Sequence, residues 1–426
     1  SLSGTTREIV ESIRIAKSRN AKVIFITANP APETAARCDE VLRVAYLKNL
    51  DTGTKISPQF SILVMIDILY SYYFANDSYF KAQKYKETLS AIQGRCGKRR
   101  RSGMSNGKTY LGVDIGGTSV KLGLVDEQGV IRYSEAYDVA FDRYETPILK
   151  TVLKSMKLFL AEHEVTEQEL AGIGVSATGG IDTVNGVVIG SAGHIQNWEG
   201  SRIKEEMEKM FHLPTTVLND ANAAALGEMW IGAAADRRNV IVMTVGTGVG
   251  GGIIVDSKIL LGANGLAGEI GHIVINSDGE LCSCGNHGCM EHYGSTTALI
   301  RRVRDAASCG KIILPEEQEL DGRFIFSEAE KGSTAMLELL DSWIDDIASG
   351  LVGLVHIFNP ELILIGGGVS AQKELFIDRL REKVMARCMP HFVKHLELKA
   401  AELGNDAGLI GAVYYCIQQN DLVCDK

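Results

Sequence analysis

The sequence predicts an α/β protein whose larger part is built from two halves. Two observations support this prediction. Hydrophobic patterns typical of strands and of helices alternate along nearly the whole chain. In addition, three strand-like segments run directly into glycine-rich turns, at residues 114–118, 244–250 and 366–368. The chain has 426 residues, which exceeds one ordinary hydrophobic core, so two or three domains are expected.

Composition and charge narrow the class of protein. The chain is 45% apolar and 23% charged, as in soluble globular proteins, and its net charge of -9 argues against direct binding of nucleic acid. The longest apolar run, residues 60–75, contains Asp67 and is shorter than a membrane span. The first ten residues lack the pattern of a signal peptide. Nine mostly isolated cysteines suit a reducing compartment, so we expect a cytoplasmic protein that does not contact membranes.

The first segment, residues 1–93, alternates helix-like and strand-like patterns, with strands expected at 22–28 and 40–44. It opens with "SLSGTT", whose hydroxyls either cap a following helix or bind a phosphate at the helix N-terminus. This stretch resembles the S-x-S-G-x-T phosphosugar loop of sugar isomerase (SIS) domains, which occur in RpiR-type regulators. The resemblance implies a partial SIS domain of flavodoxin-like α/β fold over residues 1–93, because the elements that precede this loop in an SIS domain are missing.

Residues 94–108 read "GRCGKRRRSGMSNGK" and are predicted to be a basic, flexible linker. A nucleic-acid-binding tail is the alternative, but no aromatic residues are interleaved with these charges. A second domain is expected over residues 109–420.

This domain contains the three glycine-rich turns, in "DIGGTSVK", "TVGTGVGGGI" and "LILIGGGVS". Glycine lets backbone N–H groups approach a phosphate closely, and Asp114 is suited to hold Mg²⁺ through water. One such turn is ordinary hairpin chemistry, but three indicate a nucleotide held between two halves. None matches a P-loop or a dinucleotide-binding fingerprint. The candidate nucleotide-binding residues are Asp114, Gly116, Gly117, Thr118, Thr244, Gly246, Thr247, Gly248, Gly250, Gly366, Gly367 and Gly368.

A candidate acid follows in "LPTTVLNDANAAALGE", which runs from a strand into a helix with Asn219 and Asp220 at the junction. Asp220 is either a helix cap or the carboxylate that accepts a proton when a hydroxyl attacks a phosphate. Asn219 is able to donate to and accept from sugar hydroxyls.

The stretch "CSCGNHGCMEHY" places Cys282, Cys284 and Cys289 within eight positions, and His272 precedes Cys282 by ten. Three thiolates and one imidazole form a closed tetrahedral set, which predicts structural zinc rather than free thiols. A zinc ion there would fix a loop that carries Glu269 and Glu291, whose carboxylates would then accept hydrogen bonds from a sugar.

The pairing of Asp-Gly-Gly-Thr with Gly-Thr-Gly resembles the actin-like ATPase (ribonuclease H-like) sugar kinase fold, in which two α/β lobes close over ATP. With E-x-G-H and C-x-C-G-x-x-G-C-x-E added, residues 109–416 resemble the ROK family (repressors, open reading frames, kinases). The resemblance implies that Asp220 is the catalytic base. It also implies that the sugar ligands include Gly180, Asn219, Glu269, His272 and Glu291. His194 replaces the asparagine that many relatives use for sugar, or is an ordinary loop histidine.

The implied activity is ATP-dependent phosphorylation of a hexose or N-acetylhexosamine, with the 6-hydroxyl as the expected acceptor, as in glucokinases or N-acetylmannosamine kinases. ATP, Mg²⁺ and structural zinc are the implied cofactors, and a homodimer or larger homo-oligomer is expected. Two alternatives remain at this point. One is a sugar-responsive ROK repressor, which needs a preceding winged helix and need not keep the base or the ATP turns. The other is a phosphosugar sensor without turnover.

Overall fold

A computed structural model describes residues 107–140, 142–190, 195–314 and 320–424, together with short pieces between residues 13 and 43. The chain divides into two compact units, Ser1–Gly103 and Met104–Lys426. In the first unit, β1 (Ile24–Thr27) and β2 (Glu40–Arg43) pair in parallel, which confirms the two strands expected there. The opening "SLSGTT" and most of the predicted linker lie outside the described residues.

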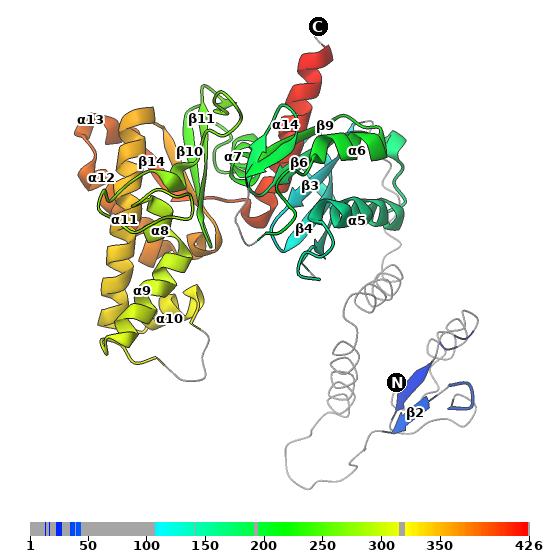
Figure 1. The fold of residues 1–426 in the computed structure, drawn as a ribbon, viewed down its shortest axis with the longest axis horizontal. Coiled ribbons are helices and arrows are strands. Elements are labelled where there is room, and N and C mark those ends of the chain that lie inside the picture. Colours follow the sequence, from blue (N-terminus) through cyan, green and yellow to red (C-terminus); the bar gives the residue numbers. More distant parts are fainter. Residues whose placement is uncertain are drawn as a thin grey trace. The chain divides into compact units, whose positions relative to one another are not determined.

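The first lobe of the larger unit is a five-stranded sheet in the order β5-β4-β3-β6-β9. Its first three strands form an antiparallel meander, and β6 and β9 then add in parallel. Helices α5 and α6 cover one face of the sheet, and α14 covers the other (Figure 1). The elements are β3 (Thr109–Ile115), β4 (Ser119–Asp126), β5 (Ile131–Asp138), α5 (Ile148–Glu162), β6 (Leu170–Ala177), α6 (Ile203–Phe211) and β9 (Thr215–Asn219).

The second lobe repeats the same topology, with strand order β12-β11-β10-β13-β14. Strands β10 to β12 are antiparallel, and β13 and β14 add in parallel. Strand β13 is apolar throughout because helices cover both of its faces. The elements are β10 (Val240–Val245), β11 (Val249–Val255), β12 (Lys258–Ile259), α8 (Met290–Gly294), α9 (Thr296–Ser308), α10 (Gly322–Glu330), α11 (Thr334–Phe358), β13 (Leu362–Gly366), α12 (Arg379–Arg387), α13 (Pro390–Val393) and β14 (Glu397–Ala400).

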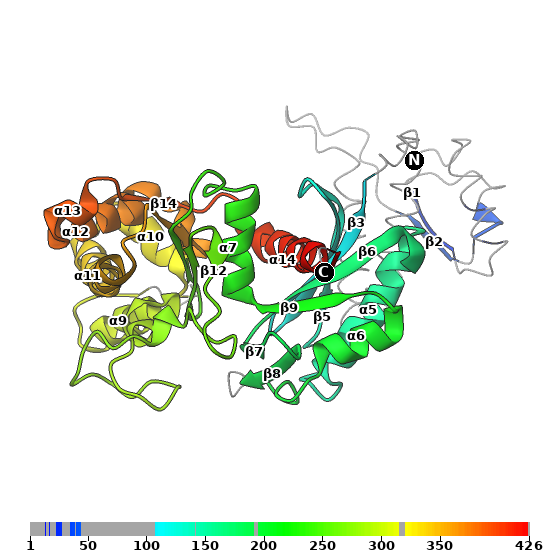
Figure 2. The same cartoon turned by 90° about the horizontal axis from the view of Figure 1, so that it is seen from above.

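Two helices cross between the lobes and pack against each other (Figure 2). Helix α7 (Asp220–Trp230) leads from the first sheet to the second, and α14 (Ala407–Cys424) leads back. Their backbones approach so closely that a Cβ at Gly411 would lie 1.7 Å from the Ala223 carbonyl oxygen. The two sheets and the crossed helices confirm the predicted two-lobed α/β fold of the actin-like ATPase class.

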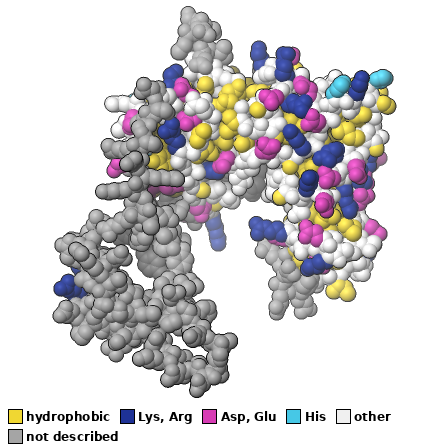
Figure 3. Space-filling model, turned by 180° about the vertical axis from the view of Figure 1, so that it is seen from behind, with side chains coloured by type: hydrophobic (Ala, Val, Ile, Leu, Met, Phe, Trp, Pro, Cys, Tyr) yellow, Lys and Arg dark blue, Asp and Glu magenta, His cyan; other side chains and the backbone are white. Residues whose placement is uncertain are grey.

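Smaller elements complete this unit. A hairpin of β7 (Gly180–Asp182) and β8 (Val187–Gly190) follows β6, and short helical turns occur at η1 (Glu167–Glu169), η2 (Ile270–His272), η3 (Gly368–Ala371), η4 (Lys373–Asp378) and η5 (Gly404–Asp406). No helix in the described part of the chain has the length and apolar composition that a membrane crossing needs. On the face drawn in Figure 3, basic and acidic side chains of the described residues are interspersed.

Candidate active site

The first glycine turn (residues 114–118) joins β3 to β4 and begins with Asp114. Parallel pairing of β3 with β6 places Asp114 beside Ser176. The buried Ser176 hydroxyl donates a hydrogen bond to Asp114 Oδ1 at 2.5 Å. On the neighbouring strand β4, Lys121 lies opposite Asp114. Its ammonium group forms an ion pair with Asp406. Burial raises the pKa of Asp114, while the Ser176 hydrogen bond and the Lys121 charge act in the opposite direction.

The second glycine turn (residues 244–250) joins β10 to β11 and contacts the start of α9. The Thr296 N–H donates to the Gly246 carbonyl at 2.8 Å, and the Thr297 hydroxyl donates to the Thr247 carbonyl at 2.9 Å. The third glycine turn (residues 366–368) follows β13, whose Gly366 pairs with Thr244. The fold therefore brings two of the three predicted nucleotide-binding turns together at the carboxyl ends of adjacent parallel strands, where ligands commonly bind in open α/β sheets.

Asn219 and Asp220 lie where β9 ends and α7 begins. Asn219, not Asp220, is the helix cap, because its Oδ1 accepts hydrogen bonds from the N–H groups of Ala221 and Asn222. Its amide nitrogen donates to the Gly179 carbonyl at 3.0 Å. Capping by Asn219 leaves Asp220 as the first residue of the helix. The next residue, Ala221, packs on the second glycine turn, since a Cβ at Gly250 would lie 3.0 Å from the Ala221 Cβ.

The environment of Asp220 makes it a stronger base than an ordinary carboxylate. Burial raises its pKa to about 6, and the negative charges of Asp114 and Glu269 act in the same direction. A hydrogen bond from the Ala221 N–H partly offsets this effect. Such a group is ionised at neutral pH and is still basic enough to take a proton during a reaction.

The predicted metal ligands come together in the loop between η2 and α8, which we call the metal loop (residues 272–289). One ligand atom from each of His272, Cys282, Cys284 and Cys289 lies within 4.8 Å of all the others. Two short bridges, Val274 with Cys289 and Leu281 with His287, give the loop its shape.

The spacing of these atoms fits zinc. A tetrahedral ion with Zn–S bonds of about 2.3 Å places two sulfurs about 3.8 Å apart, and a sulfur and an imidazole nitrogen about 3.6 Å apart. The Cys284 and Cys289 sulfurs lie 3.6 Å apart, and the Cys282 sulfur lies 3.7 Å from His272 Nδ1. Burial and the neighbouring thiols raise the pKa of Cys289 to about 12. A bound cation would act in the opposite direction, because it favours the thiolate form of its ligands.

The two carboxylates predicted to bind sugar flank the metal loop. Glu269 immediately precedes η2, and Glu291 is the second residue of α8, two positions after Cys289. Glu291 Oε2 accepts a hydrogen bond from the Val249 N–H at 2.9 Å. One oxygen of Glu291 therefore already supports the second glycine turn, a role that the sequence did not predict.

Of the two remaining predicted sugar ligands, the structure describes Gly180 but not His194. Gly180 begins β7, next to Gly179, whose carbonyl binds the Asn219 amide. His194 lies outside the described residues, although the segment that follows it is described from Ile195.

Two polar residues that support this arrangement were missed in the sequence. Ser176 is one, and only strand pairing reveals it. Glu228 is the other, and it is a fully buried carboxylate on α7. It accepts hydrogen bonds from the N–H groups of Ala233, Glu402 and Leu403 at 2.8–2.9 Å. Glu228 thus links α7 to the segment that leads into α14. An acid that ends the largely apolar stretch "ANAAALGE" was the signal.

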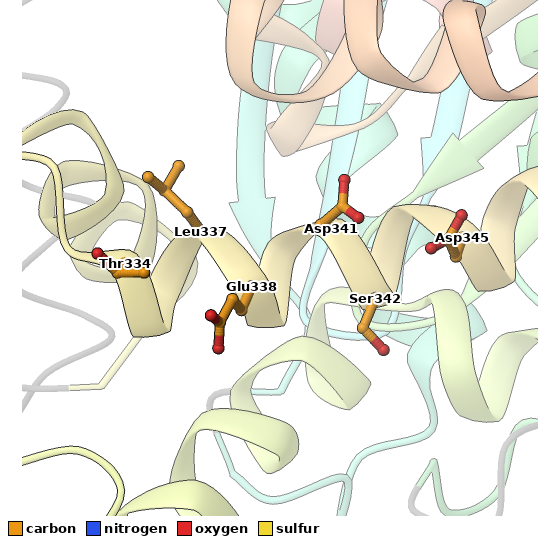
Figure 4. Close-up of a pocket in the computed structure, with 6 residues that line it drawn as sticks. All are labelled: Thr334, Leu337, Glu338, Asp341, Ser342 and Asp345. Carbon is orange, nitrogen blue, oxygen red and sulfur yellow. The ribbon is translucent and has the colours of Figure 1, made fainter.

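A cavity of about 390 Å³ lies along α11, and that helix supplies all of its lining residues (Figure 4). Its Asp341 and Asp345 both accept from Lys383, at 3.0 and 2.9 Å, and it contains no predicted site residue. A second cavity of about 150 Å³ instead joins the second glycine turn to the metal loop. Its lining residues are Thr247, Cys282, Ser283, Glu291, His292, Ser295, Thr297, Ala298 and Arg301.

Two α/β lobes of like topology, with an acid and glycine turns between them, define an actin-like ATPase or sugar kinase. Residues 110–419 match the ROK family. The glucokinase of Thermotoga maritima is 34% identical over 308 residues, covering 71% of this chain and 95% of the glucokinase. The xylose repressor of Caldicellulosiruptor bescii is 29% identical, covering 72% of this chain and 77% of the repressor. The chain therefore belongs to the ROK family.

Solved structures agree with this assignment. The ROK family glucokinase from Streptomyces griseus, solved with glucose and AMPPNP, has a TM-score of 0.61 and 31% identity, covering 72% of this chain and 98% of that one. The ROK hexokinase from Thermus thermophilus has a TM-score of 0.61 and 26% identity, with 73% and 99% covered. Together the glucokinase relatives and kinase structures support one activity, the ATP-dependent phosphorylation of a hexose.

Proposed function

We propose that this sugar kinase transfers the γ-phosphoryl group of ATP to the 6-hydroxyl of a hexose or N-acetylhexosamine, with Asp220 as general base. The single observation that carries this proposal is the placement of Asp220. It begins α7, its neighbour Ala221 packs on the second glycine turn, and it lies within the electrostatic reach of Asp114, with its pKa raised to about 6.

In this mechanism the sugar hydroxyl gives its proton to Asp220 as its oxygen attacks the γ-phosphorus. Phosphoryl transfer depends mainly on positioning and on stabilisation of charge. The backbone N–H groups of the three glycine turns would hold the phosphates, and Glu269, His272 and Glu291 would orient the sugar. The Ser176 hydroxyl binds one oxygen of Asp114.

Two metal ions belong to the proposal. Asp114 would hold Mg²⁺ through water, and that ion would neutralise phosphate charge. His272 and the three cysteines would hold a structural zinc ion, and the closed set of four protein ligands leaves no position for catalysis. The zinc would keep Glu269 and Glu291, at the two ends of the metal loop, in place.

The experiment that tests this function is a screen for ADP release over a panel of sugars that includes glucose, N-acetylmannosamine, N-acetylglucosamine and β-glucosides. Release with at least one sugar, slowed by about 10²- to 10⁴-fold in Asp220→Asn, is the expected result. Sugar binding without any ADP release would instead favour a sugar-responsive regulator, the function suggested by the xylose repressor relative.

Other proposals concern the rest of the chain. Residues 1–93 are proposed to be a partial SIS domain and residues 94–108 a linker, on sequence resemblance and composition. A homo-oligomeric state and a cytoplasmic location also remain predictions from the sequence.

A further inference from the structure

Two loops that pack on the first glycine turn have unusual backbone conformations. Arg143 and Tyr144 have φ angles of 57° and 66°, and Asn197 has a φ of 57°. Asparagine tolerates this left-handed region, but arginine and tyrosine rarely adopt it. Two consecutive strained residues persist only where surrounding contacts hold them, and such strain concentrates at functional sites.

The contacts that hold Tyr144 and Asn197 in these conformations involve the first glycine turn. The Tyr144 hydroxyl donates a hydrogen bond to the Gly117 carbonyl at 2.9 Å. The Asn197 side-chain amide donates to the Tyr144 carbonyl at 3.2 Å. Ile195 also packs on the turn, since a Cβ at Gly117 would lie 3.2 Å from its Cδ1. Trp198 anchors this second loop, because its buried indole N–H donates to the Thr178 carbonyl at 2.9 Å.

The Tyr144 bond orients one peptide group of the turn. In a trans peptide the C=O of one residue and the N–H of the next point in opposite directions. A Gly117 carbonyl that is bound by Tyr144 therefore directs the Thr118 N–H away from Tyr144. Thr118 is one of the residues expected to bind phosphate, and a phosphate needs N–H groups that converge on it.

We propose that Tyr144 is a positioning residue for phosphoryl transfer, which holds the first glycine turn in its phosphate-binding conformation. Asn197 supports it by fixing the strained Tyr144 backbone. This inference rests on the proposed kinase function, because it assumes that the first glycine turn binds the nucleotide.

The test is Tyr144→Phe in the full chain, a change that removes only the hydroxyl. The matched control is Tyr133→Phe, because Tyr133 is 51% exposed on β5 and stacks on His163. Titration calorimetry with Mg-AMPPNP, and separately with glucose or the sugar that the ADP screen selects, measures each affinity without turnover. Loss of one hydrogen bond should raise the nucleotide dissociation constant about three- to tenfold. Sugar affinity should change less than about twofold, and the control should match the wild type.

Asn197→Gly tests the supporting contact to the Tyr144 carbonyl, because glycine accepts the positive φ but lacks the amide donor. It should weaken nucleotide binding in the same direction. The double variant should be no weaker than Tyr144→Phe alone, since both residues act on the same turn.

Unchanged nucleotide affinity in Tyr144→Phe would overturn the inference, and so would an equal loss of sugar and nucleotide binding. The nucleotide titration needs no sugar. A wild-type protein that binds Mg-AMPPNP but phosphorylates no sugar would therefore refute the proposed function while leaving the role of Tyr144 open to this measurement.

Discussion

Replacing Asp220 with asparagine should lower activity and raise stability at the same time. Asparagine keeps the oxygen that accepts the Ala221 N–H at 2.8 Å, but it cannot take a proton. General-base catalysis contributes about 10²- to 10⁴-fold, so kcat should fall by that order. Sugar and nucleotide dissociation constants should change less than about tenfold, or about 1.4 kcal/mol.

The stability gain follows from the pKa of Asp220. The rise of this pKa from 3.8 to about 6 means that the folded state disfavours the ionised carboxylate of Asp220. Each pH unit corresponds to about 1.4 kcal/mol, so ionised Asp220 destabilises the fold by up to about 3 kcal/mol. A carboxyl with a raised pKa favours the folded state below its unfolded pKa, near 4, and this advantage is lost as pH rises through about 6. The asparagine variant should therefore unfold at a higher temperature than the wild type at pH 7.5, and the gain should vanish near pH 4.

Three measurements check this prediction together: steady-state rates, titration calorimetry with each substrate, and thermal unfolding from pH 4 to 8. In the wild type, kcat/KM for the sugar should fall as pH drops below about 6, when Asp220 becomes protonated. Glu269→Gln is the matched comparison, a neutral substitution at the neighbouring carboxylate. An asparagine variant with full activity would remove Asp220 from the mechanism. An asparagine variant that loses activity but gains no stability at pH 7.5 would show that burial of ionised Asp220 does not destabilise the fold.

Three further predictions concern other residues. Purified protein should contain one zinc ion per chain by metal analysis, and Cys284→Ser should lose it together with most activity; absence of stoichiometric zinc from the wild type contradicts this. Glu269→Gln should weaken sugar binding more than the rate of the chemical step, and calorimetry beside kcat decides it. Glu228→Gln should lower the free energy of unfolding by about 1–3 kcal/mol, because an amide cannot accept from all three backbone N–H groups; denaturant unfolding measures this, and an unchanged midpoint refutes it.

Several features were predictable from the sequence because they depend on local pattern. Alternating hydrophobicity predicted strands that the structure confirms, and a glycine-rich turn after each of three strands indicated candidate nucleotide-binding elements. The spacing of His272 and the three cysteines predicted a tetrahedral metal site, and their ligand atoms do lie within 4.8 Å of one another. The sequence offered Asp220 as either a helix cap or the general base, and the structure gives the cap to Asn219.

Tertiary structure alone decided the rest, because it depends on residues far apart in the chain. Ser176 lies 62 residues from Asp114 and meets it only through the parallel pairing of β3 with β6. Glu228 binds N–H groups that lie 174 and 175 residues away, and the pKa of Asp220 depends on how deeply its helix start is buried. The sequence by itself determined which chemical groups the site contains, since motif and spacing are local properties. The packing of two lobes around α7 and α14 determined how those groups are oriented and charged, since hydrogen bonds and burial arise only when distant segments meet.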